Sequence, residues 1–284
     1  MNRTTTTLAA LALAAGGAQA QQRVLIDFGD DFGGGTNVLT VSPDANGNHW
    51  HNMDGPFYAS LTNTVGDPTD FGIGFVSNYG VNGGAAGGGL FFPQAALLGD
   101  FAVESATQDY MYSTPLDPNL PSLNFDVFLL NPDATYTFRF FGSRDEFVDY
   151  ITEYTVVGGN GTFTAQLQTS GFAISSDGFF DGNDDTIVEI SGVTPGGDDN
   201  NLINIDVATA NETFAYINIL EIIEEVQAPC AADVNADGVL DNGDIGAFVT
   251  LFLAGDLAAD FTGDGILDNG DIGAFVSAFL AGCD

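Results

Sequence analysis

Oxygen-bearing side chains recur with one spacing in two segments near the end of this 284-residue chain. Counted from the first aspartate, they stand at positions 1, 3, 5, 9 and 12 of each segment. They are Asp233, Asn235, Asp237, Asp241 and Asp244 in the first segment and Asp260, Thr262, Asp264, Asp268 and Asp271 in the second. Calcium takes about six to eight oxygen ligands, and a loop that curls around the ion turns alternate side chains inward. The spacing therefore predicts two calcium ions, with the main-chain carbonyls of Val239 and Ile266 as ligands at position 7.

The residues around these ligands fit the EF-hand calcium loop. Gly238 and Gly265 stand at position 6, where the loop turns sharply, and Asp replaces the commoner Glu at position 12. The residues DNGDIGAFV occur at 241–249 and again at 268–276, and they lead each loop into apolar residues at helical spacing. No helical pattern precedes either loop. Each unit is therefore expected to be a loop followed by one helix.

Two tandem units of this kind resemble the dockerin family over residues 230–284. The resemblance implies paired calcium sites, a small three-helix fold, and docking onto a cohesin-like protein module or another surface component. The positions that would contact this partner are Asn242, Gly243, Phe248 and Val249 in the first unit and Asn269, Gly270, Phe275 and Val276 in the second. The alternative is that the repeats form only a calcium-stabilised cap at the end of the chain.

The first twenty residues have the features of a secretory signal peptide. One arginine precedes an apolar Leu/Ala run, and Ala18-Gln19-Ala20 fits a cleavage site. We therefore expect a protein that is secreted or held at the cell surface. In such a compartment the only two cysteines, Cys230 and Cys283, are expected to form a disulfide that joins the two ends of the C-terminal module.

The formal net charge of −35, with four arginines and no lysine, restricts the possible partners. A surface this acidic repels nucleic acid, anionic lipid and polyanionic glycans, and it suits cations and neutral glycans. After the signal segment no stretch is apolar and long enough to span a bilayer, so no membrane insertion is expected.

Residues 21–224 alternate apolar and polar residues with period two, as in Leu123-Phe125-Val127-Leu129 and Phe214-Tyr216-Asn218-Leu220. Turn clusters separate about ten such runs, and no helix is evident among them. This pattern predicts a mainly β chain with an antiparallel β-sandwich of jelly-roll type, followed by the small α-helical calcium-binding domain. Residues 225–229 are expected to link the sandwich to the domain at 230–284.

The sandwich region resembles galactose-binding-like and malectin-like jelly rolls. The resemblance is spread over residues 24–29, 47–50, 135–143 and 214–222, and it implies a fold that often binds glycan. Trp50, Tyr110 and Tyr112 are the candidates for stacking on a sugar ring, with Tyr150 as a further exposed aromatic. For the His49-Trp50-His51 segment two other interpretations stay open, which are a core tryptophan between surface histidines and a metal site on the two histidines.

The motifs of serine hydrolases and of zinc peptidases are absent from the sequence. We therefore expect no catalytic residues and a secreted carbohydrate-binding protein with a calcium-dependent docking module, linked to polysaccharide recognition or degradation. Two alternatives are a secreted polysaccharide hydrolase or lyase with the same module, because a pair of carboxylates would suffice for glycoside hydrolysis, and a calcium-stabilised structural surface protein.

Overall fold

The structure is a computed structural model, and it describes residues 22–29, 39–82, 88–197, 200–211, 213–226 and 230–282. The predicted signal peptide, the predicted linker residues Gln227, Ala228 and Pro229, and Cys283 lie outside the described residues. Cys230 is not a free cysteine, and its pairing with Cys283 stays a prediction. Among the described residues no helix combines the length and apolar character needed to cross a bilayer.

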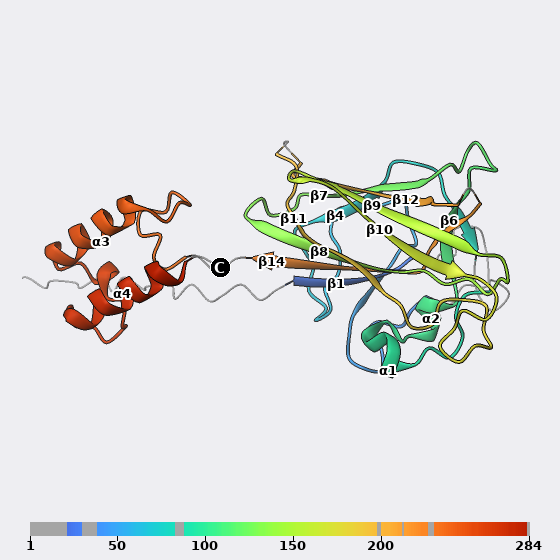
Figure 1. Cartoon of the computed structure of the whole chain (residues 1–284), viewed down its shortest axis with the longest axis horizontal. Helices are drawn as coiled ribbons and strands as arrows, with labels where there is room; N and C mark the ends of the chain where they lie inside the picture. The colour runs from blue at the N-terminus through green and yellow to red at the C-terminus, as the bar shows by residue number, and fades with distance from the viewer. Residues whose placement is uncertain are drawn as a thin grey trace, which may run out of the picture.

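The larger part of the chain is a β-sandwich of jelly-roll type, as the alternating pattern predicted (Figure 1). One sheet has five strands in the order β11 (Val188–Val193), β8 (Ala134–Phe141), β14 (Ile219–Val226), β1 (Gln22–Asp27) and β2 (Trp50–Asn52). The other has six, in the order β10 (Gly161–Ser170), β9 (Tyr150–Gly158), β12 (Ile203–Thr209), β7 (Leu123–Phe128), β4 (Gly72–Phe75) and β3 (Phe57–Tyr58). A third sheet is formed by β13 (Ala215–Ile217), β6 (Tyr110–Ser113) and β5 (Gly80–Asn82).

The two large sheets face each other across one hydrophobic core. Val24, Phe138 and Ile222 of the five-stranded sheet belong to the same buried cluster as Phe125 and Ile205 of the six-stranded sheet. Among the described strands the pairing is antiparallel except between β1 and β2, which run parallel. This exception involves a three-residue strand at the edge of the sheet, which is too short to give a period-two signal in the sequence.

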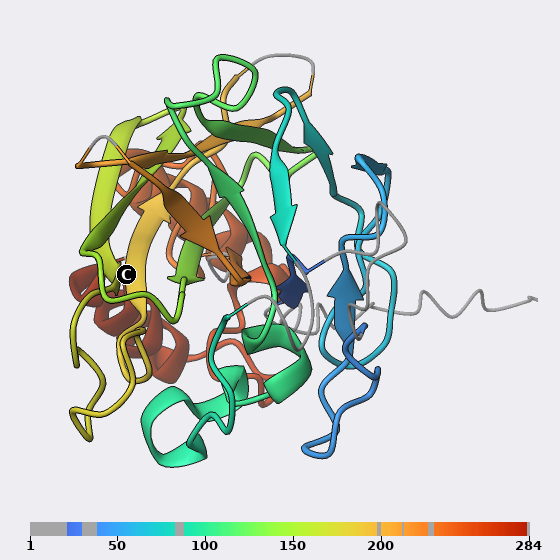
Figure 2. The same cartoon turned by 90° about the vertical axis from the view of Figure 1, so that its right-hand side faces the viewer.

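Three short helical segments, which the sequence pattern did not reveal, cover the outer face of the five-stranded sheet. They are α1 (Ala95–Leu98), the 3-10 turn η2 (Gly99–Phe101) and α2 (Glu104–Thr107), visible below the strands in Figure 2. Leu98 and Phe101 pack with Leu25, Phe141 and Ile219 in a second buried cluster. Four residues make about one helical turn, so no 3.6-residue periodicity can develop.

On the outer face of the five-stranded sheet, a buried carboxylate forms ion pairs with two of the three arginines that follow residue 20. Glu221 on β14 is fully buried and is bonded to both Arg23 and Arg139. Arg23 also reaches Asp100 on η2 at 2.8 Å. Because a buried carboxylate needs paired charges, Arg23 and Arg139 have a structural role. Arg144 is the third arginine after residue 20, and among the described residues it does not take part in this cluster.

The C-terminal part contains two helices, α3 (Asn242–Ala254) and α4 (Asn269–Ala281), with a 3-10 turn η3 (Leu257–Ala259) between them. Each helix begins with a capping box, in which Asp241 pairs with Asp244 and Asp268 pairs with Asp271. Gly255 ends α3 in the left-handed conformation, with φ of 71°. The loop-and-helix units thus fold as predicted, whereas the expected third helix is only this 3-10 turn among the described residues.

The two repeats pack through identical residues. The rings of Phe248 and Phe275 stack with centroids 4.1 Å apart and an angle of 2° between their planes. Both side chains are only 3% exposed, and they form a small core with Ala232 and Ala259. Phe248 and Phe275, which were expected to contact a partner, are instead core residues of the folded module. Among the other expected contacts, Val249 and Val276 are exposed, as are Asn242, Gly243, Asn269 and Gly270.

Candidate functional site

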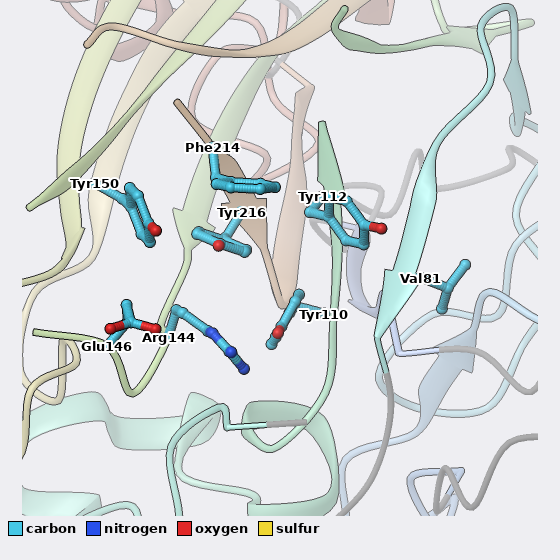
Figure 3. Close-up of a pocket in the computed structure, with 8 residues that line it drawn as sticks. All are labelled: Val81, Tyr110, Tyr112, Arg144, Glu146, Tyr150, Phe214 and Tyr216. Atoms are coloured by element: carbon cyan, nitrogen blue, oxygen red, sulfur yellow. The ribbon is translucent and has the colours of Figure 1, made fainter. Parts of the chain in front are cut away.

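An aromatic pocket lies on the outer face of the three-stranded sheet (Figure 3). Strand β6 alternates, so that Met111 faces the core while Tyr110 and Tyr112 face the pocket. Strand β13 does the same, with Ile217 in the core and Tyr216 in the pocket. The described residues that line the cavity are Val81, Tyr110, Tyr112, Arg144, Glu146, Tyr150, Phe214 and Tyr216.

The aromatic rings of the pocket hold one another in place. Phe214 and Tyr216 are stacked, with centroids 6.1 Å apart. Tyr110 packs edge-on against Tyr216 at 4.9 Å, and Tyr150 packs edge-on against Phe214 at 5.5 Å. Tyr112 contacts Phe214 at 6.0 Å. Rings that support each other edge-to-face lose little freedom when a ligand binds, so the surface is largely pre-formed.

Two side chains of opposite charge stand at one side of the pocket, where the chain leaves β8. The guanidinium of Arg144 lies over the ring of Tyr110, 5.5 Å from its centroid. Figure 3 shows Arg144 between Tyr110 and Glu146, with Tyr150 and Tyr216 beside it. Burial and the nearby Glu146 raise the pKa of Tyr150, and Arg144 acts in the opposite direction. The pocket therefore combines an aromatic wall with one cation and one anion.

The cavity has a volume of about 440 Å³, within the usual range for small-molecule sites. Burial raises the pKa of Tyr216, so its phenol stays neutral. Among the described residues, the hydroxyls of Tyr112, Tyr150 and Tyr216 have no hydrogen-bond partner within the protein. These hydroxyls can both donate and accept hydrogen bonds. The arrangement therefore suits a ligand that offers hydroxyl groups and an apolar ring face.

The structure brings together two of the three predicted sugar-stacking residues. Tyr110 and Tyr112 line the pocket, and Tyr150 joins them. Trp50 does not line the pocket and packs in the buried cluster under the short helices, whereas Tyr110 lines the pocket although it is itself only 2% exposed. Its indole N–H donates to Asp44 Oδ2 at 2.9 Å. Trp50 is therefore the core tryptophan of the alternative interpretation.

The two histidines beside Trp50 have different environments. His51 lies edge-on to Tyr58 at 4.5 Å, and its buried Nε2 has no hydrogen-bond partner. Burial lowers the pKa of His51 to about 4. His49 Nδ1 lies 3.4 Å from the hydroxyl of Ser42. Within the described ranges no group of three or more His, Cys, Asp or Glu side chains is placed to hold a metal ion.

Sequence reasoning missed Val81, Arg144, Glu146, Phe214 and Tyr216 as site residues. The alternation at Phe214 and Tyr216 was visible, but nothing in the sequence showed that this face turns outward beside Tyr110 and Tyr112. Arg144 and Glu146 stand in an irregular loop, which gives no periodic signal. Tyr216 reaches the pocket through the pairing of β13 with β6, in which it lies opposite Tyr112, and Val81 reaches it through the pairing of β5 with β6.

The two C-terminal loops turn sharply around the side chain of their first aspartate. Asp233 Oδ2 accepts a hydrogen bond from the N–H of Gly238 at 2.9 Å, and Asp260 Oδ2 accepts one from Gly265 at 2.8 Å. Both glycines have φ of +80°, in the left-handed region that favours glycine. The loops therefore turn back on themselves at position 6, but among the described residues their carboxylates are not grouped to hold a metal ion.

The last carboxylate of each loop is buried where the helix begins. Asp244 Oδ1 accepts from the N–H of Asn235 at 3.2 Å, and its Oδ2 accepts from Asp241 at 2.9 Å. These main-chain donors, Asp241 first, hold the pKa of Asp244 below its usual value. Asp271 has the same environment through Thr262 and Asp268. The hard oxygen donors of both loops fit calcium chemically, although in this structure these carboxylate oxygens bind main-chain N–H groups.

The sandwich has weak structural similarity to solved protein structures. A family 35 carbohydrate-binding module from Clostridium thermocellum aligns with 9% identity over 54% of this chain and 91% of that chain, with a TM-score of 0.28. The CBM22-1 xylan-binding domain of Paenibacillus barcinonensis Xyn10C aligns with 12% identity over 55% of this chain and 87% of that chain, also with a TM-score of 0.28. No protein-family model matches the chain. A comparison with curated proteins gives no relative.

Proposed function

We propose that the β-sandwich binds a neutral glycan in the aromatic pocket, without catalysing a reaction on it. The observation that carries the proposal is the combination in one cavity of interlocked aromatic rings, the hydroxyls of Tyr112, Tyr150 and Tyr216, which have no partner among the described residues, and the oppositely charged Arg144 and Glu146. A pyranose ring matches this surface, because its C–H face packs on aromatic rings while its hydroxyls form hydrogen bonds at its edge.

The charges of the pocket favour an uncharged ligand. Arg144 and Glu146 both line the cavity, so neither sign of charge dominates there. The rest of the surface is strongly acidic, which disfavours polyanionic glycans. A neutral sugar with adjacent hydroxyls can accept a hydrogen bond from the guanidinium and donate one to the carboxylate.

Binding is favoured over hydrolysis because one carboxylate, Glu146, lines the described part of the pocket. Glycoside hydrolysis generally uses two carboxyl groups on opposite sides of the scissile bond. A secreted hydrolase or lyase is the alternative function. The release of reducing ends from polysaccharides by the full chain would support this alternative.

The proposal is tested by isothermal titration of the full chain with neutral oligosaccharides and with uronic-acid oligosaccharides of matched length. We expect at least one neutral ligand to bind and the uronates to bind more weakly. Tyr112→Ala should abolish detectable binding, whereas Phe179→Ala, which removes a 90% exposed ring outside the pocket, should leave it unchanged. Equal affinity of both variants for the best ligand would show that the pocket is not the site.

A second proposal concerns the C-terminal module, which we infer to bind two calcium ions and to serve as a docking module in a secreted protein. The residues that would hold the ions are the position-1 and position-12 aspartates with the side chains between them in each loop. The exposed Leu253 and Leu280, at matching positions of α3 and α4, are 80% and 79% exposed and offer an apolar surface to a cohesin-like partner.

The calcium proposal predicts that a chelator lowers the helical circular-dichroism signal of α3 and α4, since the loops lose their ligand. Added calcium should restore the signal, and added magnesium should restore less of it. A helical signal that ignores chelation would contradict the proposal. The glycan titration tests the pocket independently of this chelation experiment.

A further inference from the structure

Asn218 is the one amide side chain in the otherwise aliphatic and aromatic run Ala215–Leu220, at the break between β13 and β14. Its side chain is fully buried. An amide at such a position must satisfy its own hydrogen bonds, because an unpaired buried polar group costs about 1–3 kcal/mol. The partners of this amide show what the residue holds together.

The side chain of Asn218 joins two segments that are far apart in the sequence. Its Oδ1 accepts a hydrogen bond from the N–H of Ser143 at 2.8 Å. Its Nδ2 donates to the carbonyls of Thr107 and Asp109 at 2.9 and 2.7 Å. The main chain of Asn218 is fixed as well, by bonds to Phe141 and Phe28 at 2.9 Å each.

Two of the three partners directly precede a residue that lines the pocket. Ser143 precedes Arg144, and Asp109 precedes Tyr110. Tyr216 lies two residues before Asn218 on β13, where its main chain is bonded to Thr152 and Tyr154. The 5.5 Å approach of Arg144 to the ring of Tyr110 therefore spans two segments that the Asn218 amide ties together.

We infer that Asn218 is a positioning residue for the pocket: without touching the ligand, it sets the distance between Arg144 and the tyrosine wall and thereby the affinity of the site. This inference rests on the proposed glycan-binding function for its affinity readout only. Pre-organised sites hold their contact groups to about 0.5 Å, so a loss of this clamp reduces affinity even if the fold survives.

The main test is Asn218→Ser, whose shorter side chain cannot span Ser143 on one side and Thr107 and Asp109 on the other. The matched control is Asn124→Ser, because Asn124 Nδ2 also makes two hydrogen bonds, to Asn204 and Asp206, on the outer face of the six-stranded sheet. We expect Asn218→Ser to weaken binding of the best neutral oligosaccharide by about tenfold, and Asn124→Ser by less than about twofold.

A second measurement needs no ligand. Hydrogen exchange at the Ser143 amide should accelerate in Asn218→Ser and stay unchanged in Asn124→Ser, and the near-ultraviolet tyrosine signal should weaken only in the first variant. If Asn218→Ser does not fold, Asn218→Asp keeps the shape and the acceptor for Ser143 while losing both donors, and it should loosen the segment at 107–112 while Ser143 remains protected.

The experiments distinguish a failure of glycan binding from a failure of the positioning role of Asn218. A wild-type chain that binds no glycan overturns the proposed function, and the exchange and tyrosine measurements then decide the role of Asn218. Unchanged exchange and tyrosine signals in both Asn218 variants would overturn the inference. An affinity loss no larger than that of the Asn124 control would overturn it as well.

Discussion

The aromatic pocket and the C-terminal loops are built in opposite ways. In each loop, every candidate ligand lies within a dozen consecutive residues, and the shape of the loop depends on local groups such as Gly238 and the capping box at Asp241. The pocket collects Val81, Tyr110, Arg144, Tyr150 and Tyr216 from segments far apart in the chain. The candidate ligands of a local site can therefore be listed from their spacing, whereas the residues of a composite pocket come together only after the sheets have paired.

The two regions also differ in what fixes them. The pocket belongs to a sandwich with a large core, in which Met111 and Ile217 anchor the strands that carry the tyrosines. The C-terminal module has a small core centred on the Phe248–Phe275 stack. A single change should therefore affect the module far more than the sandwich.

The largest expected effect is that of Phe248→Ala on the C-terminal module. Removing this buried ring should cost about 3–5 kcal/mol, which is enough to unfold a module of this size. Thermal unfolding followed by far-ultraviolet circular dichroism should show loss of the helical component and an unchanged β component. Leu253→Ala, which truncates an exposed side chain of the same helix, should stay within about 0.5 kcal/mol of wild type.

The next largest effect concerns His51 and the pH dependence of the sandwich. Its pKa falls from 6.5 to about 4 on folding because of burial. Between these two values the unfolded chain takes up a proton that the folded chain refuses, so stability falls as the pH drops through this window, by up to about 3 kcal/mol. Urea unfolding at several pH values should show a shallower fall in His51→Phe, and His49→Gln should behave as wild type. An equal slope in all three proteins would exclude His51 as the cause.

A smaller effect is expected for Tyr150→Ala on ligand binding. Loss of one edge of the aromatic wall should weaken binding about tenfold, the equivalent of about 1.4 kcal/mol. Titration calorimetry with the best neutral oligosaccharide gives the change directly. The proposals treat the pocket and the loops as independent, so protein treated with a chelator should show the same loss. A calcium dependence of the affinity would contradict this independence.

The smallest effect is that of neutralising the charges in the pocket. Arg144→Met and Glu146→Gln should each weaken binding by about fivefold, as expected for one lost hydrogen bond of roughly 1 kcal/mol. Added salt should change the wild-type affinity little, because a neutral ligand gains no long-range attraction. A steep salt dependence would instead indicate a charged ligand.

The same contrast explains how much could be predicted from the sequence. Period two predicted the sandwich, and repeated apolar spacing after Asp244 and Asp271 predicted α3 and α4. Tyr110 and Tyr112 were found as candidates because they are aromatic. Their partners Arg144 and Glu146 could not be, because their place depends on the end of β8 meeting β13 and the segment before β6 through the Asn218 amide.

Trp50 is a residue that the sequence offered as a site candidate and the structure places in the core. As the only tryptophan in the chain, it was a natural candidate for stacking on a sugar. The short helical segments at 95–107, which have no sequence period, cover it with Leu98 and Phe101. The residue type alone therefore did not show whether Trp50 is exposed, because the helical segments that cover it could not be predicted from the sequence.

The most direct test of the account is to map the bound glycan on the full chain by nuclear magnetic resonance. Ring signals of Tyr112, Tyr150 and Tyr216 and the side-chain N–H signal of Arg144 should shift on titration with the best neutral oligosaccharide, while signals from residues 230–282 stay in place. Shifts confined to another surface, such as the stacked Phe57 and Phe128 on the six-stranded sheet, with the pocket signals unmoved, would contradict it.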